Sequence, residues 1–311
     1  MSQQENIGKK PSLSDWLGLI RFSHTVFALP FAALAVVMAL VTPLPDGQSV
    51  AFRFRDLLGV LLCMVFARSA AMAFNRVVDA RIDAANPRTA SRHIPAGVMS
   101  SSQVRFFTFF CMIGFIGSTA IFLPNPVPLF AAVPVLMVLM GYSLAKRFTA
   151  AAHLWLGVAL SLSPLCAWVA IRGLPSVLTP ADLLAPGILA AAVAAWVTGF
   201  DIIYACQDAE FDAVAGLHSV PAKLGIAVAL KVAAGCHLLM LGLLCFLPLV
   251  ATKTGFGPIF WVVLAVVAGL VIRQHGLVRP DDLDRVNQAF FDTNAAISLI
   301  LLVGGAVDCW L

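Results

Sequence analysis

The chain has 311 residues, of which 60% are hydrophobic and only 12% are charged, and its mean hydropathy is +0.93. A soluble globular domain carries about 25% charged residues, so this composition excludes that class and indicates a membrane protein embedded in a lipid bilayer. The formal net charge of +4 is too small to predict a nucleic-acid partner.

Apolar segments of membrane-spanning length recur along the whole chain. A helix needs about 20 apolar residues to cross a bilayer, and the short alternating strands of a membrane barrel are absent from the sequence. We therefore predict an all-α, polytopic membrane protein with nine transmembrane helices in a single bundle around a central cavity. The predicted spans are residues 16–41, 56–76, 103–123, 127–144, 152–172, 183–206, 225–250, 256–275 and 288–310.

The basic residues predict the orientation of these helices. If the N-terminus is cytoplasmic, all but four of the 20 Lys and Arg residues fall on the inner side, the exceptions being Arg53, Arg55, Arg172 and Lys253. Basic loops are retained in the cytoplasm, so we predict a multi-pass protein of the inner (cytoplasmic) membrane with its C-terminus outside. Residues 1–15 form a polar cytoplasmic N-terminus, and the first apolar run is too long for a signal-peptide core of roughly 7 to 15 residues.

Arg21 lies near the cytoplasmic start of the first span, where its side chain either extends to the lipid headgroups or enters a pocket. Arg68 lies about two turns inside the second span and needs a partner or a water-filled cavity. The second span then runs into a polar stretch, residues 68–97. Steps of three or four residues separate Arg68, Met72, Asn75, Asp79 and Asp83. If the helix continues through these residues, all five lie on one face. Arg88 and Arg92 follow in the loop.

Two later segments carry similar polar groups. The fourth span ends in YSLAKR, which places Tyr142, Lys146 and Arg147 at the cytoplasmic boundary. The sixth span ends in a second acidic stretch, whose shared helix face carries Asp201, Tyr204, Asp208 and Asp212 and which is followed by Lys223. Because each acidic stretch follows the second helix of a set of four, we interpret residues 1–311 as one domain with pseudo-repeats at about 16–147 and 152–275 plus the ninth helix.

Acidic groups gathered at the mouth of a bundle repel one another unless a cation lies between them. Oxygen ligands without a His or Cys cluster favour a hard ion, and Mg²⁺ is commonly held by one or two carboxylates together with substrate phosphates. Basic side chains nearby can stabilise a departing diphosphate. The residues suited to this are Arg88, Arg92, Lys146, Arg147 and Lys223. A lipid-embedded cavity then favours a diphosphate with a hydrocarbon tail, such as a polyprenyl diphosphate, and an electron-rich aromatic acceptor.

Four motifs in order resemble the UbiA superfamily of intramembrane aromatic prenyltransferases. They are NRxxDxxxD at 75–83, RTASRHIPAG at 88–97, YxxxKR at 142–147 and DxxYxxxDxxxD at 201–212. The resemblance implies a nine-helix bundle and Mg²⁺-dependent transfer of a prenyl group to an aromatic acceptor. It also implies that catalysis and metal binding involve Asp79, Asp83, Asp208 and Asp212, with Asn75 and Asp201 completing the metal set. Tyr142, Lys146, Arg147 and Tyr204 would bind substrate.

The first motif departs from the NDxxDxxxD of many members, because Arg76 occupies its second position. This form is similar to the 4-hydroxybenzoate polyprenyltransferase-like branch, which predicts C-prenylation ortho to the hydroxyl of 4-hydroxybenzoate in quinone biosynthesis. The alternative acceptor is 1,4-dihydroxy-6-naphthoate in menaquinone biosynthesis. An acid group on either ring could pair with Arg21 or Arg68.

Two other classes of membrane protein remain as alternatives. A cation-coupled transporter can also carry acids at membrane depth, although it would place them near the bilayer centre. A phospholipid-headgroup transferase would need a DGxxAR element, which this sequence lacks.

Overall fold

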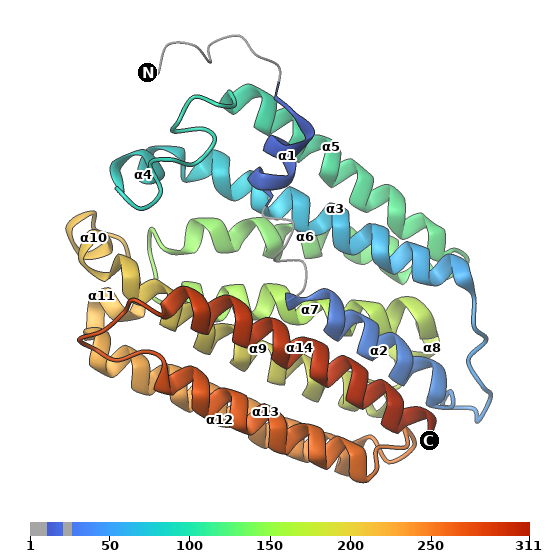
Figure 1. The fold of residues 1–311 in the computed structure, drawn as a ribbon. Coiled ribbons are helices and arrows are strands. Elements are labelled where there is room, and N and C mark those ends of the chain that lie inside the picture. The colour runs from blue at the N-terminus through green and yellow to red at the C-terminus, as the bar shows by residue number, and fades with distance from the viewer. Residues whose placement is uncertain (1–10, 21–26) are drawn as a thin grey trace.

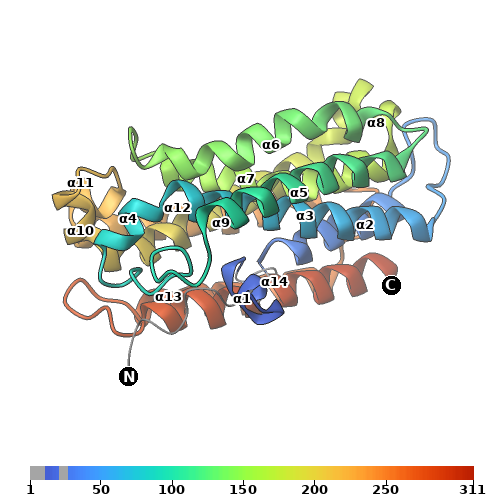
Figure 2. The same ribbon diagram turned by 90° about the horizontal axis from the view of Figure 1, so that it is seen from above.

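The computed structural model describes residues 11–20 and 27–311. These residues form helices joined by turns, with one isolated β-bridge between Arg279 and Asp282. The long helices lie side by side, and successive ones run in opposite directions (Figures 1 and 2). The prediction of an all-helical protein is therefore confirmed.

Eight helices in the described part of the chain are long and apolar enough to cross a membrane. They are α3 (Phe54–Val78), α5 (Ser101–Thr119, extended by a 3-10 turn), α6 (Val127–Ala145), α7 (Ala152–Arg172), α9 (Leu184–Ala205), α12 (Ile226–Val250), α13 (Pro258–Gly276) and α14 (Val286–Trp310). These correspond to the second to ninth predicted spans, and they make the chain a multi-pass membrane protein.

The first predicted span differs from the others. Its described part contains α2 (Leu29–Val41), which has 13 residues and is shorter than a membrane crossing of about 20. Residues 21–26 lie outside the described residues, and with them the prediction for Arg21. The short helix α1 (Leu13–Leu19) is capped by Ser12 and lies beside α3 and α5, apart from α2 (Figure 1). The Trp16 ring packs at 4.7 Å from that of Phe107.

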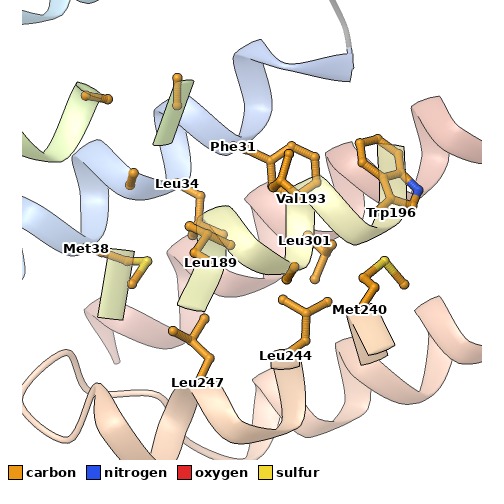
Figure 3. Packing of buried hydrophobic residues seen from close by; sticks show 14 of the residues in the cluster. Phe31, Leu34, Met38, Leu189, Val193, Trp196, Met240, Leu244, Leu247 and Leu301 are labelled. Carbon is orange, nitrogen blue, oxygen red and sulfur yellow. The ribbon is translucent and has the colours of Figure 1, made fainter. Parts of the chain in front are cut away.

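The main core surrounds α9. Figure 3 shows Trp196 and Leu189 of α9 packed between Phe31 and Leu34 of α2 on one side and Leu244 of α12 on the other. On the flank toward α7 the two backbones approach closely, because a Cβ at Gly157 would lie 2.4 Å from the carbonyl oxygen of Ala194. Small residues permit such contacts between helices in a membrane. This core leaves α3 and α6 on the far side of α7, where the cavity described below opens.

Both acidic stretches lie where a long helix is interrupted. α3 ends at Val78, Asp79 adopts φ −91° and ψ 2°, and α4 (Ala80–Ala85) begins at the next residue. α9 likewise ends at Ala205, a 3-10 turn (Cys206–Asp208) follows, and then α10 (Ala209–Val214) and α11 (Val220–Leu224). The predicted continuous helix through Asp83 is thus bent at Asp79. Figures 1 and 2 place α4, α10 and α11 at one end of the bundle.

A buried ion pair ties the opposite end together. The guanidinium of Arg172, at the end of α7, donates to both carboxylate oxygens of Asp182 and to the carbonyls of Ala39, Thr42 and Pro43. Asp182 lies in the 3-10 helix Pro180–Leu183, which follows α8 (Leu174–Leu178). Arg172 therefore joins α2, α7 and the start of α9.

Replacing Arg172 should destabilise the protein without touching the cavity. Arg172→Met removes the cation that pairs with the Asp182 carboxylate, which keeps only the hydrogen bonds from Trp168 and Ser176, and it removes the donor to three carbonyls. Removing one partner of a buried ion pair costs about 3 to 5 kcal/mol. Thermal unfolding in detergent should show a clearly lower midpoint. Arg53→Met is the control at the same end, because Arg53 is exposed. Equal midpoints for Arg172→Met and the wild type would contradict the assignment.

Candidate active site

One cavity of about 650 Å³ lies between α3, α6, α7 and the end of α9. Its polar lining is at the end of the bundle that holds α4 and α10. The polar lining there includes Arg68, Asn75, Arg76, Asp79, Asp83, Asn86, Arg88, Arg92, Tyr142, Lys146, Arg147, Asp201, Tyr204, Asp208 and Asp212. Its apolar lining continues toward the other end and includes Cys63, Phe122, Leu160, Cys166 and Val177. The cavity therefore combines a charged mouth with a long hydrocarbon-like section.

Asp79 lies at the bend between α3 and α4 and is held from two sides. Its Oδ2 accepts a hydrogen bond from Nδ2 of Asn75 at 2.7 Å, and its Oδ1 accepts one from Nη2 of Arg147 at 2.8 Å. Burial raises the pKa of Asp79 above its ordinary value. The positive charge of Arg147 lowers this pKa in part, and the nearby carboxylate of Asp83 raises it further. A cation placed between the two carboxylates would relieve this repulsion.

Asp83 is almost fully buried one turn further along, in α4. Its Oδ1 accepts a hydrogen bond from Nη1 of Arg92 at 2.6 Å. Its Oδ2 lies 3.9 Å from Nη1 of Arg76 and has no hydrogen-bond partner. Arg76, which replaces the acid seen in many members of the resembling family, thus faces the carboxylate of the next acid in the motif.

Asp208 joins the two acidic stretches. Its Oδ1 accepts hydrogen bonds from Nδ2 of Asn86 at 2.9 Å and from Nε of Arg88 at 2.8 Å, and Nη2 of Arg88 donates to Oδ2. Arg88 also donates to the hydroxyl of Tyr204 at 2.9 Å. Burial alone would lower the pKa of Arg88, but the bonds to Asp208 and Tyr204 outweigh it and raise the pKa. Arg88 therefore stays charged, and it ties the loop after α4 to the end of α9.

Asp212 repeats the position of Asp83. Both residues lie four positions after the acid at the helix interruption, and both are buried. Asp212 is 2% exposed, and its Oδ2 has no hydrogen-bond partner. In each acidic stretch, the carboxylate at the helix interruption pairs with an arginine. The carboxylate four positions later has one oxygen without a hydrogen bond.

The other predicted site residues divide into three groups. Arg68, Tyr142, Lys146, Tyr204 and Asp201 line the cavity with the acids. Lys223 lies in the last turn of α11 and is not among the lining residues. Arg21 lies outside the described residues.

The structure adds two polar residues that the sequence reasoning did not select. Asn86 binds Asp208, and its position in NPRTASR was the available signal. His153, in the first turn of α7, binds Asp201 at 2.7 Å and is 1% exposed. It lies 48 positions from Asp201, and no local spacing relates the two.

The acidic set fits a hard metal ion. Within residues 11–20 and 27–311, no three His, Cys, Asp or Glu side chains already converge as a preformed metal site. Asp79, Asp83 and Asp208 instead form ion pairs with arginines. The buried oxygens of Asp83 and Asp212 that lack hydrogen bonds are all-oxygen donors of the kind that Mg²⁺ prefers.

Taken together, the fold and the cavity define a multi-pass membrane protein suited to a substrate with an anionic head and a hydrocarbon tail. Comparison with known proteins agrees with this class. Residues 28–300 match the UbiA prenyltransferase family. The chain therefore belongs to the UbiA prenyltransferase family and is a prenyltransferase, which favours the enzyme interpretation over the transporter.

Relatives and solved structures place the chain within this family. It is 28% identical to the 4-hydroxybenzoate octaprenyltransferase of Tolumonas auensis, over 78% of this chain and 80% of the relative. A protein of the same name from Nitrosomonas europaea is also 28% identical, over 80% of each chain. The apo structure of a UbiA homolog from Aeropyrum pernix K1 superposes with a TM-score of 0.78 at 30% identity, covering 92% of this chain and 98% of that one. A UbiA homolog from Archaeoglobus fulgidus bound to GPP and Mg²⁺ shares the fold, with a TM-score of 0.70 at 16% identity over 96% and 100%.

Removing charge from either acidic stretch should abolish activity without unfolding the protein. Asp79→Asn and Asp208→Asn preserve side-chain shape, and each should lower the rate of prenyl transfer by about 100-fold or more. Each should also weaken binding of Mn²⁺, measured by electron paramagnetic resonance as a spectroscopic substitute for Mg²⁺. Asp281→Asn, in an exposed loop, is the matched control. Full turnover in both cavity variants would contradict the site.

Proposed function

We propose that the protein transfers a polyprenyl group from a polyprenyl diphosphate to an aromatic acid, with Mg²⁺, in quinone biosynthesis. The observation that carries this proposal is a single cavity in which both acidic stretches meet at one end and apolar residues line the rest. The relatives named 4-hydroxybenzoate octaprenyltransferase support 4-hydroxybenzoate as the acceptor.

The charged end is suited to a metal-bound diphosphate. Asp79, Asp83, Asp208 and Asp212 would hold Mg²⁺, which supplies positive charge to the phosphate oxygens as the diphosphate departs. With these carboxylates engaged as metal ligands, the guanidiniums of Arg88, Arg92 and Arg147, which now pair with them, would be available to the phosphate oxygens. Lys146 lines the same end, and its ammonium forms no salt bridge in the described part of the chain. It is therefore a ready cation for a phosphate oxygen.

The apolar section is suited to the prenyl chain. Its lining comes mainly from α3, α6 and α7, and it extends from the acids to Phe122, in the 3-10 turn after α5, and Val177 of α8. A hydrocarbon chain in this section would keep water away from the carbon that becomes electron-poor when its bond to the diphosphate breaks.

The reaction that fits these residues is an electrophilic substitution. The bond between the allylic carbon and the diphosphate oxygen breaks, and its electron pair leaves with the diphosphate, whose charge Lys146 and Arg147 stabilise. The ring carbon ortho to the hydroxyl forms the new carbon–carbon bond. The hydrogen on that carbon then leaves as a proton, taken up by a carboxylate or by the released diphosphate, and the ring regains its aromaticity.

The acid group of the acceptor has a suitable partner in Arg68. This residue of α3 lines the cavity, and its buried Nε has no hydrogen-bond partner. A guanidinium in that position can bind a carboxylate through two parallel hydrogen bonds. Both 4-hydroxybenzoate and 1,4-dihydroxy-6-naphthoate carry the required carboxylate, so Arg68 would serve either acceptor.

The distribution of charge supports a cytoplasmic location for the charged end. Four basic residues lie at the opposite ends of their helices: Arg53 and Arg55 at the start of α3, Arg172 at the end of α7 and Lys253 just after α12. Figure 1 shows these helix ends away from α4 and α10. Basic loops remain in the cytoplasm, so both substrates' polar groups would enter from that side of the inner membrane.

Product analysis tests the proposal directly. Membranes that contain the protein are incubated with Mg²⁺, a polyprenyl diphosphate and either 4-hydroxybenzoate or 1,4-dihydroxy-6-naphthoate, and the product is identified by mass. We expect the ring-prenylated acid of 4-hydroxybenzoate and no product after chelation of the metal. If only the naphthoate is prenylated, the proposed acceptor is wrong but the proposed reaction stands. Failure with both acids would refute the proposal.

Narrowing the apolar section should shorten the prenyl chain that is accepted. Cys166 of α7 lines this section, and Cys166→Trp adds an indole ring that a long chain cannot pass. We expect turnover with a short allylic diphosphate to persist while turnover with an eight-unit chain falls by about tenfold or more, as for steric rejection in a hydrophobic pocket. Cys245→Trp, on an exposed face of α12, is the control. If Cys166→Trp leaves the preference for prenyl-chain length unchanged, the prenyl chain binds outside this section.

A further inference from the structure

A buried histidine holds the innermost acid of the second stretch. His153 lies in the first turn of α7, is 1% exposed, and approaches Oδ2 of Asp201 with its Nδ1 at 2.7 Å. Its other ring nitrogen, Nε2, accepts a hydrogen bond from the backbone N–H of Val220 at 3.2 Å. Because a backbone N–H can only donate, Nε2 carries no hydrogen, and the hydrogen of the neutral ring lies on Nδ1. His153 is thus a fixed donor to Asp201.

This arrangement fixes the second oxygen of Asp201 in the cavity. Asp201 lines the cavity, and its side chain is 21% exposed, so the carboxylate is bound on one side and open on the other. It lies seven residues before Asp208, which places it about 10 Å deeper along α9 at 1.5 Å per residue. Asp201 is therefore set apart from Asp208 and Asp212 along the helix axis.

Two other polar residues of the cavity lining bear on what Asp201 can recognise. On α9, Tyr204 packs at 4.4 Å against Phe290 and accepts a hydrogen bond from Arg88, so its hydroxyl is already engaged. Arg68, on α3, lines the same cavity and offers a guanidinium that suits a carboxylate. An ionised carboxylate can only accept hydrogen bonds, so Asp201 suits a hydroxyl donor.

We propose that His153 is a positioning residue that holds the Asp201 carboxylate so that it accepts the hydrogen bond of the acceptor's ring hydroxyl. This inference rests on the proposed function and adds to it the group that reads the hydroxyl. A hydroxyl that donates to a carboxylate gains electron density on its oxygen, and the ring carbon ortho to it becomes a better nucleophile. The inference also removes Asp201 from the metal set and leaves Asp79, Asp83, Asp208 and Asp212.

Two variants separate the two hydrogen bonds of His153. In His153→Asn the amide nitrogen can replace Nδ1 as the donor to Asp201. In His153→Gln the amide oxygen can replace Nε2 as the acceptor for Val220, but the donor to Asp201 is lost. We expect His153→Asn to remain close to the wild type and His153→Gln to raise the KM of the hydroxylated acid by about tenfold, as for loss of a hydrogen bond to a charged group. His218→Asn, in the neighbouring loop, is the matched control.

The decisive measurement is the ratio of the KM of the hydroxylated acid to the inhibition constant of a competitor that lacks the hydroxyl. A purely structural role for His153 would leave this ratio unchanged. The competitor is the same acid without its hydroxyl, benzoate for 4-hydroxybenzoate or 2-naphthoate for the dihydroxynaphthoate. We expect His153→Gln to leave the inhibition constant of this competitor and the KM of the prenyl diphosphate unchanged. Parallel weakening of acid and competitor, or an equal loss in His153→Asn and His153→Gln, would overturn the inference.

Asp201→Asn keeps the inference testable if the histidine variants fold poorly, because the amide oxygen can still accept from His153. It should raise the KM of the hydroxylated acid in the same selective way and leave Mn²⁺ binding unchanged. Loss of Mn²⁺ affinity would return Asp201 to the metal set and overturn the inference. Absence of turnover by the wild type with both acids would instead refute the proposed function, and the role of His153 with it.

Discussion

Buried carboxylates need cations, and this requirement organises the charged end of the bundle. Asp208 binds Arg88 and Asn86 from the loop after α4, while Asp79 binds Arg147 from the loop after α6. These contacts run between segments that are far apart in the sequence, and they draw both acidic stretches to one cavity. A buried carboxylate without a cationic partner costs free energy, so the ion pairs with Arg88 and Arg147 hold the loops in place. The same carboxylates and guanidiniums would later bind the metal and the diphosphate.

Much of this arrangement could be predicted from local sequence. Hydropathy located the eight long helices, and steps of three or four residues grouped Asp79 with Asp83 and Asp208 with Asp212. Those spacings survived the bends at Asp79 and Asp208, because hydrogen bonds such as Asp83 N to Asp79 O at 2.7 Å continue the helical pattern across the interruption. The roles of these residues in metal and substrate binding stay predictions, as do the internal repeat and the orientation in the membrane.

Other features depended on packing that local sequence does not encode. The apolar run at 16–41 predicted a first span, and among its described residues α1 packs on α3 and α5 while α2 joins the core around α9. Lys223 was selected for its charge, but its place on α11 keeps it out of the cavity lining. His153 was overlooked because a histidine near a helix start has no distinctive spacing, and only the fold brings it to Asp201. In the sequence, Arg76 indicates only that one carboxylate of the motif is missing. The structure shows its guanidinium 3.9 Å from the Asp83 carboxylate.

The central claim is that both acidic stretches contact one metal-bound diphosphate. The most direct test is a crystal structure with Mn²⁺ and a non-reactive prenyl thiodiphosphate, in which anomalous scattering locates the metal. We expect manganese coordinated directly by carboxylate oxygens of both stretches, Asp79 or Asp83 on one side and Asp208 or Asp212 on the other, with the diphosphate between them. Metal and diphosphate bound to one stretch alone would contradict it.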